Sequence, residues 1–273
     1  MPYADRGTHR IHYDVHGPPD APPLLLIMGM SFSSRAWDPL PVRLAEDFRV
    51  VLFDNRGTGR STLHRRFYRI HHLAEDAAAV LDAAGVESAH VFGISMGGMV
   101  ALELALRHEA RVRSLTLGAT CAGWFRSRKM ALGTLGTMFA ASLLGRRARM
   151  LPPLFVSPEH LARDPEGFAR WHAGVERAGS LTSLLQTAAI VRHSTERRLS
   201  GLRVPVLVLT GDRDLLIPPE NSRRLAELLR AELVVLEGAG HCFPVEQPDA
   251  VVEALARHVR AAGAPTRAPA GPP

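Results

Sequence analysis

Short apolar runs alternate with longer segments of helical periodicity along most of the chain. Strands that are buried on both faces of a sheet form such continuous apolar runs, and helices connect them when they are parallel. The pattern therefore predicts an α/β fold with a mostly parallel sheet flanked by helices. The predicted strands cover residues 24–28, 50–53, 90–93, 114–117, 206–210 and 233–236, after an antiparallel strand within residues 8–16. The predicted helices cover residues 72–84, 97–108, 220–230 and 247–262.

The alternation breaks between residues 119 and 202, where more than eighty residues separate two apolar runs. This segment has helical periodicity, and prolines interrupt it at Pro152, Pro153, Pro158 and Pro165. A simple loop of this length is not expected in a compact domain. We therefore predict a helical cap over residues 119–202, inserted into an α/β core that consists of residues 1–118 and 203–262. The proline-rich segment 263–273 is predicted to be a disordered tail.

Composition places the chain among ordinary globular proteins. It has 273 residues, of which 46% are hydrophobic, enough for one well-buried core. The net charge of +6 comes almost entirely from arginine, since Lys129 is the only lysine, and the basic residues are scattered. We therefore expect a small-molecule substrate and no nucleic-acid partner. Cys121 and Cys242 form neither a disulfide framework nor a metal-binding pattern, so a cytoplasmic protein is expected.

Residues 130–145 could alternatively be interpreted as a membrane-associated segment. Residues 130–145 are weakly polar, but they are shorter than the ~20 residues that a spanning helix needs. Arginines flank them on both sides, which allows contact with a membrane surface as an alternative. We favour the interpretation that this segment is a cap helix that covers a substrate pocket.

The first residues lack the basic and apolar regions of a signal peptide. Nothing in the sequence indicates an oligomeric state.

The sequence Gly93-Ile94-Ser95-Met96-Gly97-Gly98 lies between a predicted strand and a predicted helix. A serine in a tight strand-to-helix turn needs neighbours without side chains two positions before and after it, and Gly93 and Gly97 meet this need. Such a turn exposes the Ser95 hydroxyl and places the Met96 amide at a helix N-terminus, where it can donate to an oxyanion. Ser95 is therefore the candidate nucleophile.

From Thr8 to about Ala262 the chain resembles the α/β-hydrolase superfamily, in the subgroup of esterases, enol-lactonases and cofactor-free haloperoxidases. The resemblance implies an eight-stranded, mostly parallel sheet with a helical cap, and chemistry without a metal or an organic cofactor. The segment 53–61 is similar to the family's loop after the second core strand, and its Asp54 and Arg56 are interpreted as structural. On the family pattern the Met30 amide is the second oxyanion donor, and Gly29 lets the backbone approach the substrate. Met28 stands where many relatives have histidine.

Two further glycine-containing segments follow apolar runs and contain the candidate acid and base. They are residues 211–218 and 238–241, and both runs should end at the same sheet edge as Ser95. The family match makes Asp214 the acid, with Asp212 as the alternative, and His241 is preferred as base among the thirteen histidines. Cys242, beside His241, lacks the strand-to-helix turn that a nucleophile in this fold needs.

The candidate residues divide the chemistry of acyl transfer among them. Histidine can take and return the serine proton because its ordinary pKa is about 6.5. The aspartate holds the ring in one tautomer, and the two amides stabilise the tetrahedral intermediate. We therefore predict hydrolysis of a carboxylic ester or lactone through a Ser95 acyl-enzyme. The same triad could serve C–C bond hydrolysis, a lyase reaction or perhydrolase chemistry, and a member of the fold without turnover could bind a ligand.

Substrate specificity is expected to depend on an apolar pocket beneath the predicted cap. Its candidate residues are Gly29, Trp124, Met138, Phe139, Phe155 and Trp171. They indicate a small, largely hydrophobic substrate, with packing of the cap on the core as the alternative role for each of them.

Overall fold

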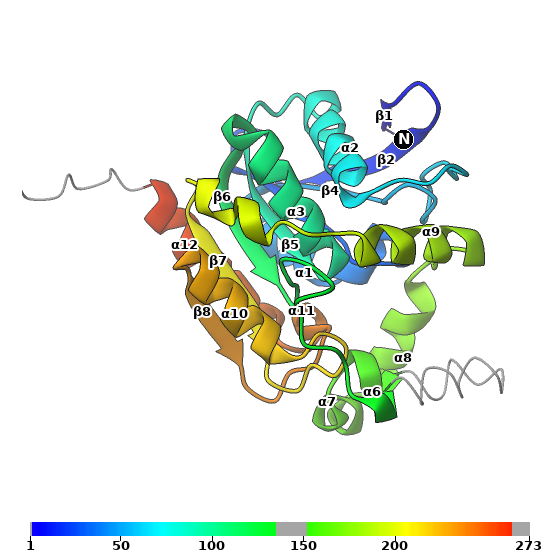
Figure 1. The fold of residues 1–273 in the computed structure, drawn as a ribbon, viewed down its shortest axis with the longest axis vertical. Coiled ribbons are helices and arrows are strands. Elements are labelled where there is room, and N and C mark those ends of the chain that lie inside the picture. Colours follow the sequence, from blue (N-terminus) through cyan, green and yellow to red (C-terminus); the bar gives the residue numbers. More distant parts are fainter. Residues whose placement is uncertain (1, 135–151, 264–273) are drawn as a thin grey trace, which may run out of the picture.

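A computed structural model describes residues 2–134 and 152–263 (Figure 1). One twisted eight-stranded sheet runs through the molecule, in the order β1-β2-β4-β3-β5-β6-β7-β8. The strands are β1 (Tyr3–Asp5), β2 (Arg10–His16), β3 (Pro23–Ile27), β4 (Arg49–Phe53), β5 (Ala89–Ile94), β6 (Val112–Gly118), β7 (Val206–Gly211) and β8 (Glu232–Leu236). The strands from β4 to β8 pair in parallel, whereas β2 pairs antiparallel with β1 and β4. The predicted mostly parallel sheet is confirmed.

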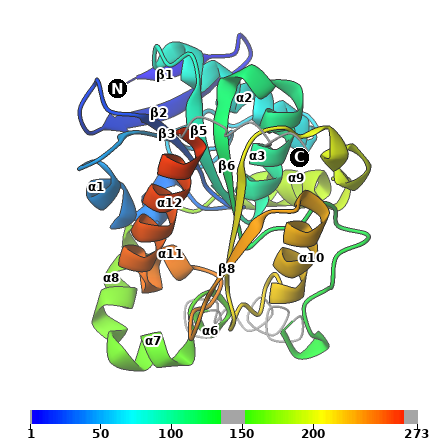
Figure 2. The ribbon, with the colours of Figure 1, turned by 90° about the vertical axis from the view of Figure 1, so that its left-hand side faces the viewer.

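Helices cover both faces of this sheet (Figure 2). Those on one face are α2 (Ile70–Ala83), α3 (Met96–Arg107) and α10 (Pro219–Leu229), and those on the other are α1 (Leu40–Leu44), α11 (Phe243–Glu246) and α12 (Pro248–Gly263). The central strands are therefore buried on both sides, and Leu25, Val51 and Phe92 have no exposed surface. This double burial explains why their sequences are apolar without alternation.

Strands β6 and β7 are direct neighbours in the sheet, and the described residues between them add no strand to it. The described helices of this segment are α6 (Pro152–Phe155), α7 (Pro158–Arg163), α8 (Pro165–Gly174) and α9 (Ser180–Val191), followed by the 3₁₀ helix η3 (Glu196–Gly201). Pro158 and Pro165 stand at the first position of α7 and α8, where proline is favoured because its missing amide has no helical partner. We refer to residues 119–202 as the insertion.

Most predicted elements lie within two residues of the observed ones. Gly85 follows the C-cap of α2 with a φ of +65°, the left-handed conformation in which helices commonly end at glycine. The sequence analysis missed β1, which has three residues and no apolar run. Of the predicted tail, Gly263 belongs to α12, and the rest lies outside the described residues.

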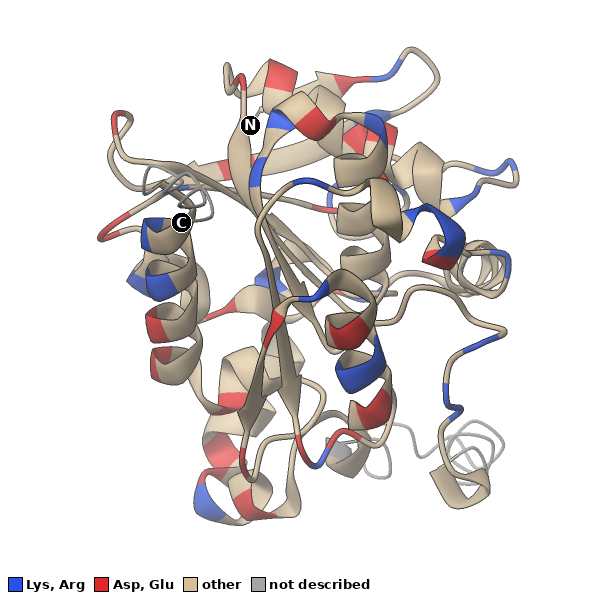
Figure 3. Ribbon diagram, turned by 60° about the vertical axis from the view of Figure 1, so that its left-hand side comes forward, with Lys and Arg blue, Asp and Glu red and all other residues tan. Residues whose placement is uncertain are grey.

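Positions of basic and acidic residues are mixed along the helices and loops of the ribbon in Figure 3. Within residues 2–134 and 152–263, no helix is long and apolar enough to cross a membrane. The charged residues Asp54 and Arg56 of the loop after β4 have partners in neighbouring elements. Asp76 accepts two hydrogen bonds of 2.7 Å from Arg56, and buried Asp54 accepts from the backbone amide and the hydroxyl of Ser34. These contacts support the structural interpretation of this loop.

Buried His193 makes the fold sensitive to acid. Desolvation lowers the pKa of His193 to about 4, although Glu103 lies 3.9 Å from the ring and opposes the shift. The unfolded chain binds a proton near pH 6.5, so this contribution to stability is complete above pH 6.5 and is lost as the pH falls towards 4. From pH 7 to pH 5, the unfolding free energy of the wild type should therefore fall by about 2 kcal/mol more than that of the His193→Gln variant. Denaturant unfolding at both pH values measures this, and equal losses in both proteins would contradict it.

Candidate active site

Ser95 occupies a strained turn between β5 and α3. Its φ of 57° and ψ of −122° lie in a region that non-glycine residues rarely adopt, and such strain persists only where the surroundings enforce it. The backbone amide of Ser95 donates to Gly118 O (2.8 Å), and Thr120 Oγ1 donates to Ser95 O (2.7 Å). The turn is therefore held by the end of β6 and the first residues of the insertion.

The glycines around Ser95 are required by close backbone contacts. A Cβ atom at Gly93 would lie 2.2 Å from the carbonyl oxygen of Gly97, and a Cβ atom at Gly97 would lie 2.0 Å from the carbonyl oxygen of Ile27. Neither atom could move away without separating α3 from the strands beneath it. The sequence therefore folds here as the glycine spacing predicts.

Asp214 and His241 are hydrogen-bonded to each other at the carboxyl ends of β7 and β8. His241 Nδ1 lies 2.8 Å from Asp214 Oδ2, and Asp214 is almost fully buried. The other carboxylate oxygen accepts from the amides of Leu216 (2.8 Å) and Ile217 (2.9 Å). Asp214 is thus oriented by its own loop, and it fixes a His241 tautomer with Nδ1 as donor, which leaves Nε2 as acceptor. Asp212, the alternative acid, instead accepts from the amide of Gly238 (2.7 Å).

The loop that carries His241 is anchored by a buried carboxylate. Glu246 Oε1 accepts from the amide of Gly240 (2.7 Å), and Oε2 accepts from the amide (3.0 Å) and hydroxyl (2.6 Å) of Ser157 in the insertion. The amide of Cys242 donates to Phe155 O (2.7 Å). Contacts on both sides of His241 therefore join the histidine loop to the end of α6 and the start of α7. The sequence analysis missed Glu246, whose only signal was a carboxylate five residues after the histidine.

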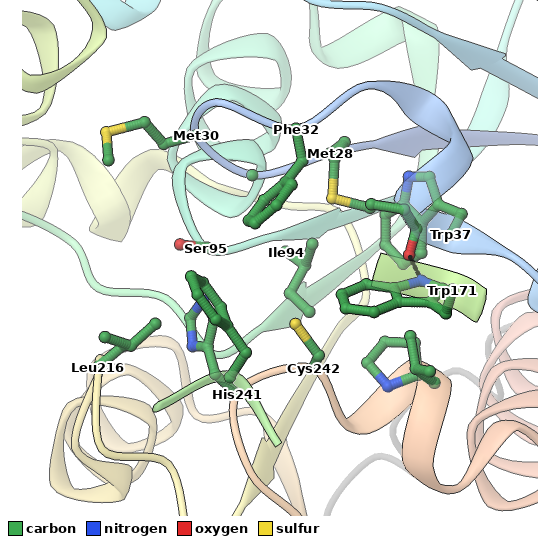
Figure 4. Close-up of a pocket in the computed structure, with 15 residues that line it drawn as sticks. Met28, Met30, Phe32, Trp37, Ile94, Ser95, Trp171, Leu216, His241 and Cys242 are labelled. Atoms are coloured by element: carbon green, nitrogen blue, oxygen red, sulfur yellow. Dashed lines mark hydrogen bonds between the residues drawn. The ribbon is translucent and has the colours of Figure 1, made fainter. Parts of the chain in front are cut away.

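Ser95 and His241 line one pocket (Figure 4). Among the described residues no hydrogen bond joins the serine hydroxyl to the histidine ring, and such catalytic bonds often form fully only when substrate is bound. The pocket encloses about 590 Å³ of non-atom space, part of which is open solvent at its mouth. Its lining residues are Met28, Gly29, Met30, Phe32, Ala36, Trp37, Ile94, Ser95, Phe155, Trp171, Leu216, His241, Cys242, Pro244 and Val245.

The loop after β3 brings its backbone against Ser95. A Cβ atom at Gly29 would lie 3.1 Å from the Cβ of Ser95, so the Gly29–Met30 peptide passes next to the serine. Asn55 Nδ2 donates to Met28 O (2.9 Å) and holds the start of this loop. Neither the Met30 amide nor the Met96 amide donates to another residue within the described part of the chain. Both amides are therefore available as oxyanion donors.

The apolar walls come from two parts of the chain. Phe155 and Trp171, both predicted, belong to the insertion, and the Trp171 indole donates to Ala36 O (3.3 Å; dashed line in Figure 4). Phe32 and Trp37 come from the loop after β3 and from η1 (Ser34–Trp37), which the prediction did not consider. Trp124 is not among the described lining residues, and its ring packs instead under Lys129 Nζ. Met138 and Phe139 lie outside the described residues.

The pocket also contains Cys242, which could compete as a nucleophile. Desolvation, followed by the charges of Glu246 and Asp214, raises the pKa of its thiol well above the ordinary value. The reactive thiolate is therefore suppressed at neutral pH, since only the ionised form is a good nucleophile. This agrees with Ser95, rather than Cys242, as the candidate nucleophile.

Comparison with known proteins gives one family match. The family model described as "alpha/beta hydrolase fold" matches residues 22–248. A protein of Azorhizobium caulinodans with the name "Putative carbamate hydrolase RutD" is 34% identical over 266 residues, which cover 93% of this chain and 97% of that protein.

Two solved structures have similar folds over nearly their whole lengths. The enol-lactonase from Burkholderia xenovorans LB400 has a TM-score of 0.82 at 26% identity, covering 95% of this chain and 100% of its own. The 2-hydroxy-6-oxo-6-phenylhexa-2,4-dienoate hydrolase from Rhodococcus sp. strain RHA1 has a TM-score of 0.77 at 26% identity, covering 95% of this chain and 98% of its own.

Proposed function

This chain belongs to the α/β-hydrolase fold family, and on that premise we propose that it cleaves a carboxylic ester or lactone through a Ser95 acyl-enzyme. The observation that carries the proposal is that the loops after four strands, β3, β5, β7 and β8, meet at one sheet edge. A strained serine, an Asp214–His241 pair and the Gly29–Met30 peptide share this edge. The serine and histidine face an apolar pocket.

The proposed reaction proceeds in two steps. His241 Nε2 takes the Ser95 proton while Oγ attacks the carbonyl carbon, and the Met30 and Met96 amides stabilise the resulting oxyanion by ~3 kcal/mol per donor. The intermediate collapses, the C–O bond to the leaving alcohol breaks, and His241 returns the proton to that alcohol. Water then attacks the acyl-enzyme with His241 as base, which releases the acid and restores Ser95.

The pocket lining supports a hydrophobic acyl or alkyl group in the substrate. Aromatic side chains, Met28, Ile94 and Leu216 form most of the wall, and a polar substituent would lose hydrogen bonds to water on entering it. We propose that the insertion acts as a cap, since Phe155 and Trp171 reach this wall from α6 and α8.

Two relatives define the second candidate functions. The named activity of the Azorhizobium protein is carbamate hydrolysis, which uses the same attack on a carbonyl group and differs in the leaving group. The named activity of the Rhodococcus enzyme is hydrolysis of a dienoate. Both fit the triad, so the nature of the bond that is cleaved has to come from substrate tests.

A substrate panel tests this proposal. We expect turnover of p-nitrophenyl esters or lactones with apolar acyl groups to exceed that of matched carbamates. We also expect a fluorophosphonate probe to label the peptide that contains Ser95, as identified by mass spectrometry. A folded protein that the probe leaves unlabelled would contradict the serine mechanism, whereas faster turnover of carbamates would move the assignment to the activity named for its relative.

A further inference from the structure

One side chain of the insertion is hydrogen-bonded directly to the candidate oxyanion loop. Gln186, on α9, has no exposed surface, and its Oε1 accepts from the amide of Ser31 (2.7 Å). Its Nε2 donates to Thr58 Oγ1 (3.4 Å) in the loop after β4. The bond from Ser31 is short, whereas the 3.4 Å contact with Thr58 is longer than an ordinary N–H···O hydrogen bond and therefore weak. The Ser31 amide is thus the main partner that orients the Gln186 side chain.

All the polar groups of Ser31 bond to the insertion. Besides the amide bond to Gln186, the Ser31 hydroxyl lies 2.9 Å from Ser183 Oγ, and the amide of Ala178 donates to Ser31 O (2.8 Å). Ser31 has a φ of 67°, a left-handed conformation that costs a non-glycine residue energy unless its surroundings compensate. These three hydrogen bonds provide that compensation, so the conformation of Ser31 depends on α9 and the segment before it.

The peptide that carries the Met30 amide lies between two anchored residues. The peptide that carries this amide joins Gly29 to Met30, and Ser31 is the next residue. Asn55 holds Met28 O on the core side of the loop, and Gln186 holds the Ser31 amide on the insertion side. A glycine between the two anchors would otherwise let the peptide rotate, because glycine restricts its dihedral angles least.

We infer that Gln186 is a positioning residue that aims the Met30 amide at the oxyanion. The inference rests on the proposed function, because it assumes that this amide stabilises the intermediate. Gln186 makes no bond to Ser95 or His241 and is not among the described residues lining the pocket, so it does not touch the substrate. Loss of Gln186 should therefore weaken stabilisation of the transition state and leave substrate binding unchanged.

Gln186→Met tests the inference, because methionine has a similar shape but offers the Ser31 amide only a weak acceptor. Removal of one oxyanion donor lowers kcat by about 10²- to 10³-fold, and misdirection of a donor should cost part of this, about 10- to 100-fold. We expect that loss in kcat with KM nearly unchanged. The affinity for a trifluoromethyl ketone, which forms a tetrahedral adduct with the serine, should fall in parallel with kcat.

Thr58→Val is the matched control, since it removes the other hydrogen bond of Gln186 and leaves the one to Ser31 in place. This variant should keep the wild-type kcat. Ser183→Ala is the second test if Gln186→Met does not fold, because Ser183 is only half-buried. It removes the hydroxyl bond to Ser31, and we expect a smaller loss in kcat, again without a change in KM.

The outcomes separate this inference from the proposed function. If the wild-type protein shows no Ser95-dependent turnover, the proposed function is wrong. If the wild type turns over substrate while folded Gln186→Met keeps its kcat, or if only its KM rises, the positioning role is wrong. Equal losses in Thr58→Val and Gln186→Met would also overturn it, because the effect would then come from packing between α9 and the core.

Discussion

Replacement of Ser95 by alanine is expected to lower kcat by about 10⁶-fold, the size of effect found when the nucleophile of such a triad is removed alone. The loss is this large because Asp214 and His241 cannot activate water in place of the missing hydroxyl. What remains is stabilisation by the oxyanion amides and substrate binding. Steady-state kinetics on the best substrate of the panel measures the effect.

The fold of the Ser95→Ala protein must be unchanged for this result to be informative. Alanine in the strained turn removes only one oxygen, and the backbone bonds to Gly118 and Thr120 remain. Ser200→Ala is a matched control, because Ser200 is exposed, lies in η3 and is not among the described residues that line the pocket. A folded Ser95→Ala protein that keeps wild-type turnover would show that another residue performs the chemistry.

The second large effect is expected from Gly97→Ala. The added Cβ atom would lie 2.0 Å from Ile27 O and 2.8 Å from Met28 O, both of them backbone atoms of β3 and the residue after it. To relieve this clash, α3 would have to move away from β3, and this movement would disrupt the packing of α3 on the central sheet. We therefore expect a loss of more than about 4 kcal/mol of unfolding free energy, in the range reserved for core disruption. Equilibrium denaturation in urea measures it.

Gly201→Ala provides the comparison for this prediction. Gly201 ends η3, and a Cβ atom there would meet no atom within 4 Å. Its unfolding free energy should stay within about 0.5 kcal/mol of the wild type, as for most surface substitutions. Equal stabilities of the two variants would contradict the steric account of the turn at Ser95.

The sequence predicts the central sheet well because burial on both faces leaves a strong local pattern. Strands β3, β4 and β7 consist mostly of consecutive apolar residues, above all Leu and Val, which is the pattern of a strand buried on both faces. In contrast, β1 is stabilised by pairing with β2 across a turn and carries no such pattern in its three residues. Its existence follows from a partner, and the local sequence does not encode that partner.

The candidate site divides along the same line. Ser95 and its glycines were predictable because the turn restricts residues that are adjacent in the sequence. Asp214 needed the family resemblance, since Asp212 has the same local setting and only the hydrogen bond to His241 separates them. Gln186 could not be predicted, because its partner Ser31 lies 155 positions away in the sequence. Its local sequence shows only one polar residue within a helix.

The placement of the insertion between two neighbouring strands has a consequence for recombination. Strands β6 and β7 pair directly with each other. Replacing the helices between them with those of a related protein would therefore leave the pairing of the strands unchanged. On the proposed function, we expect a chimera of this kind to keep the reaction and to change the substrate. It would succeed only where the donor helix offers an acceptor to Ser31 and the splice lies after Thr120, because this threonine still has to hold the Ser95 turn.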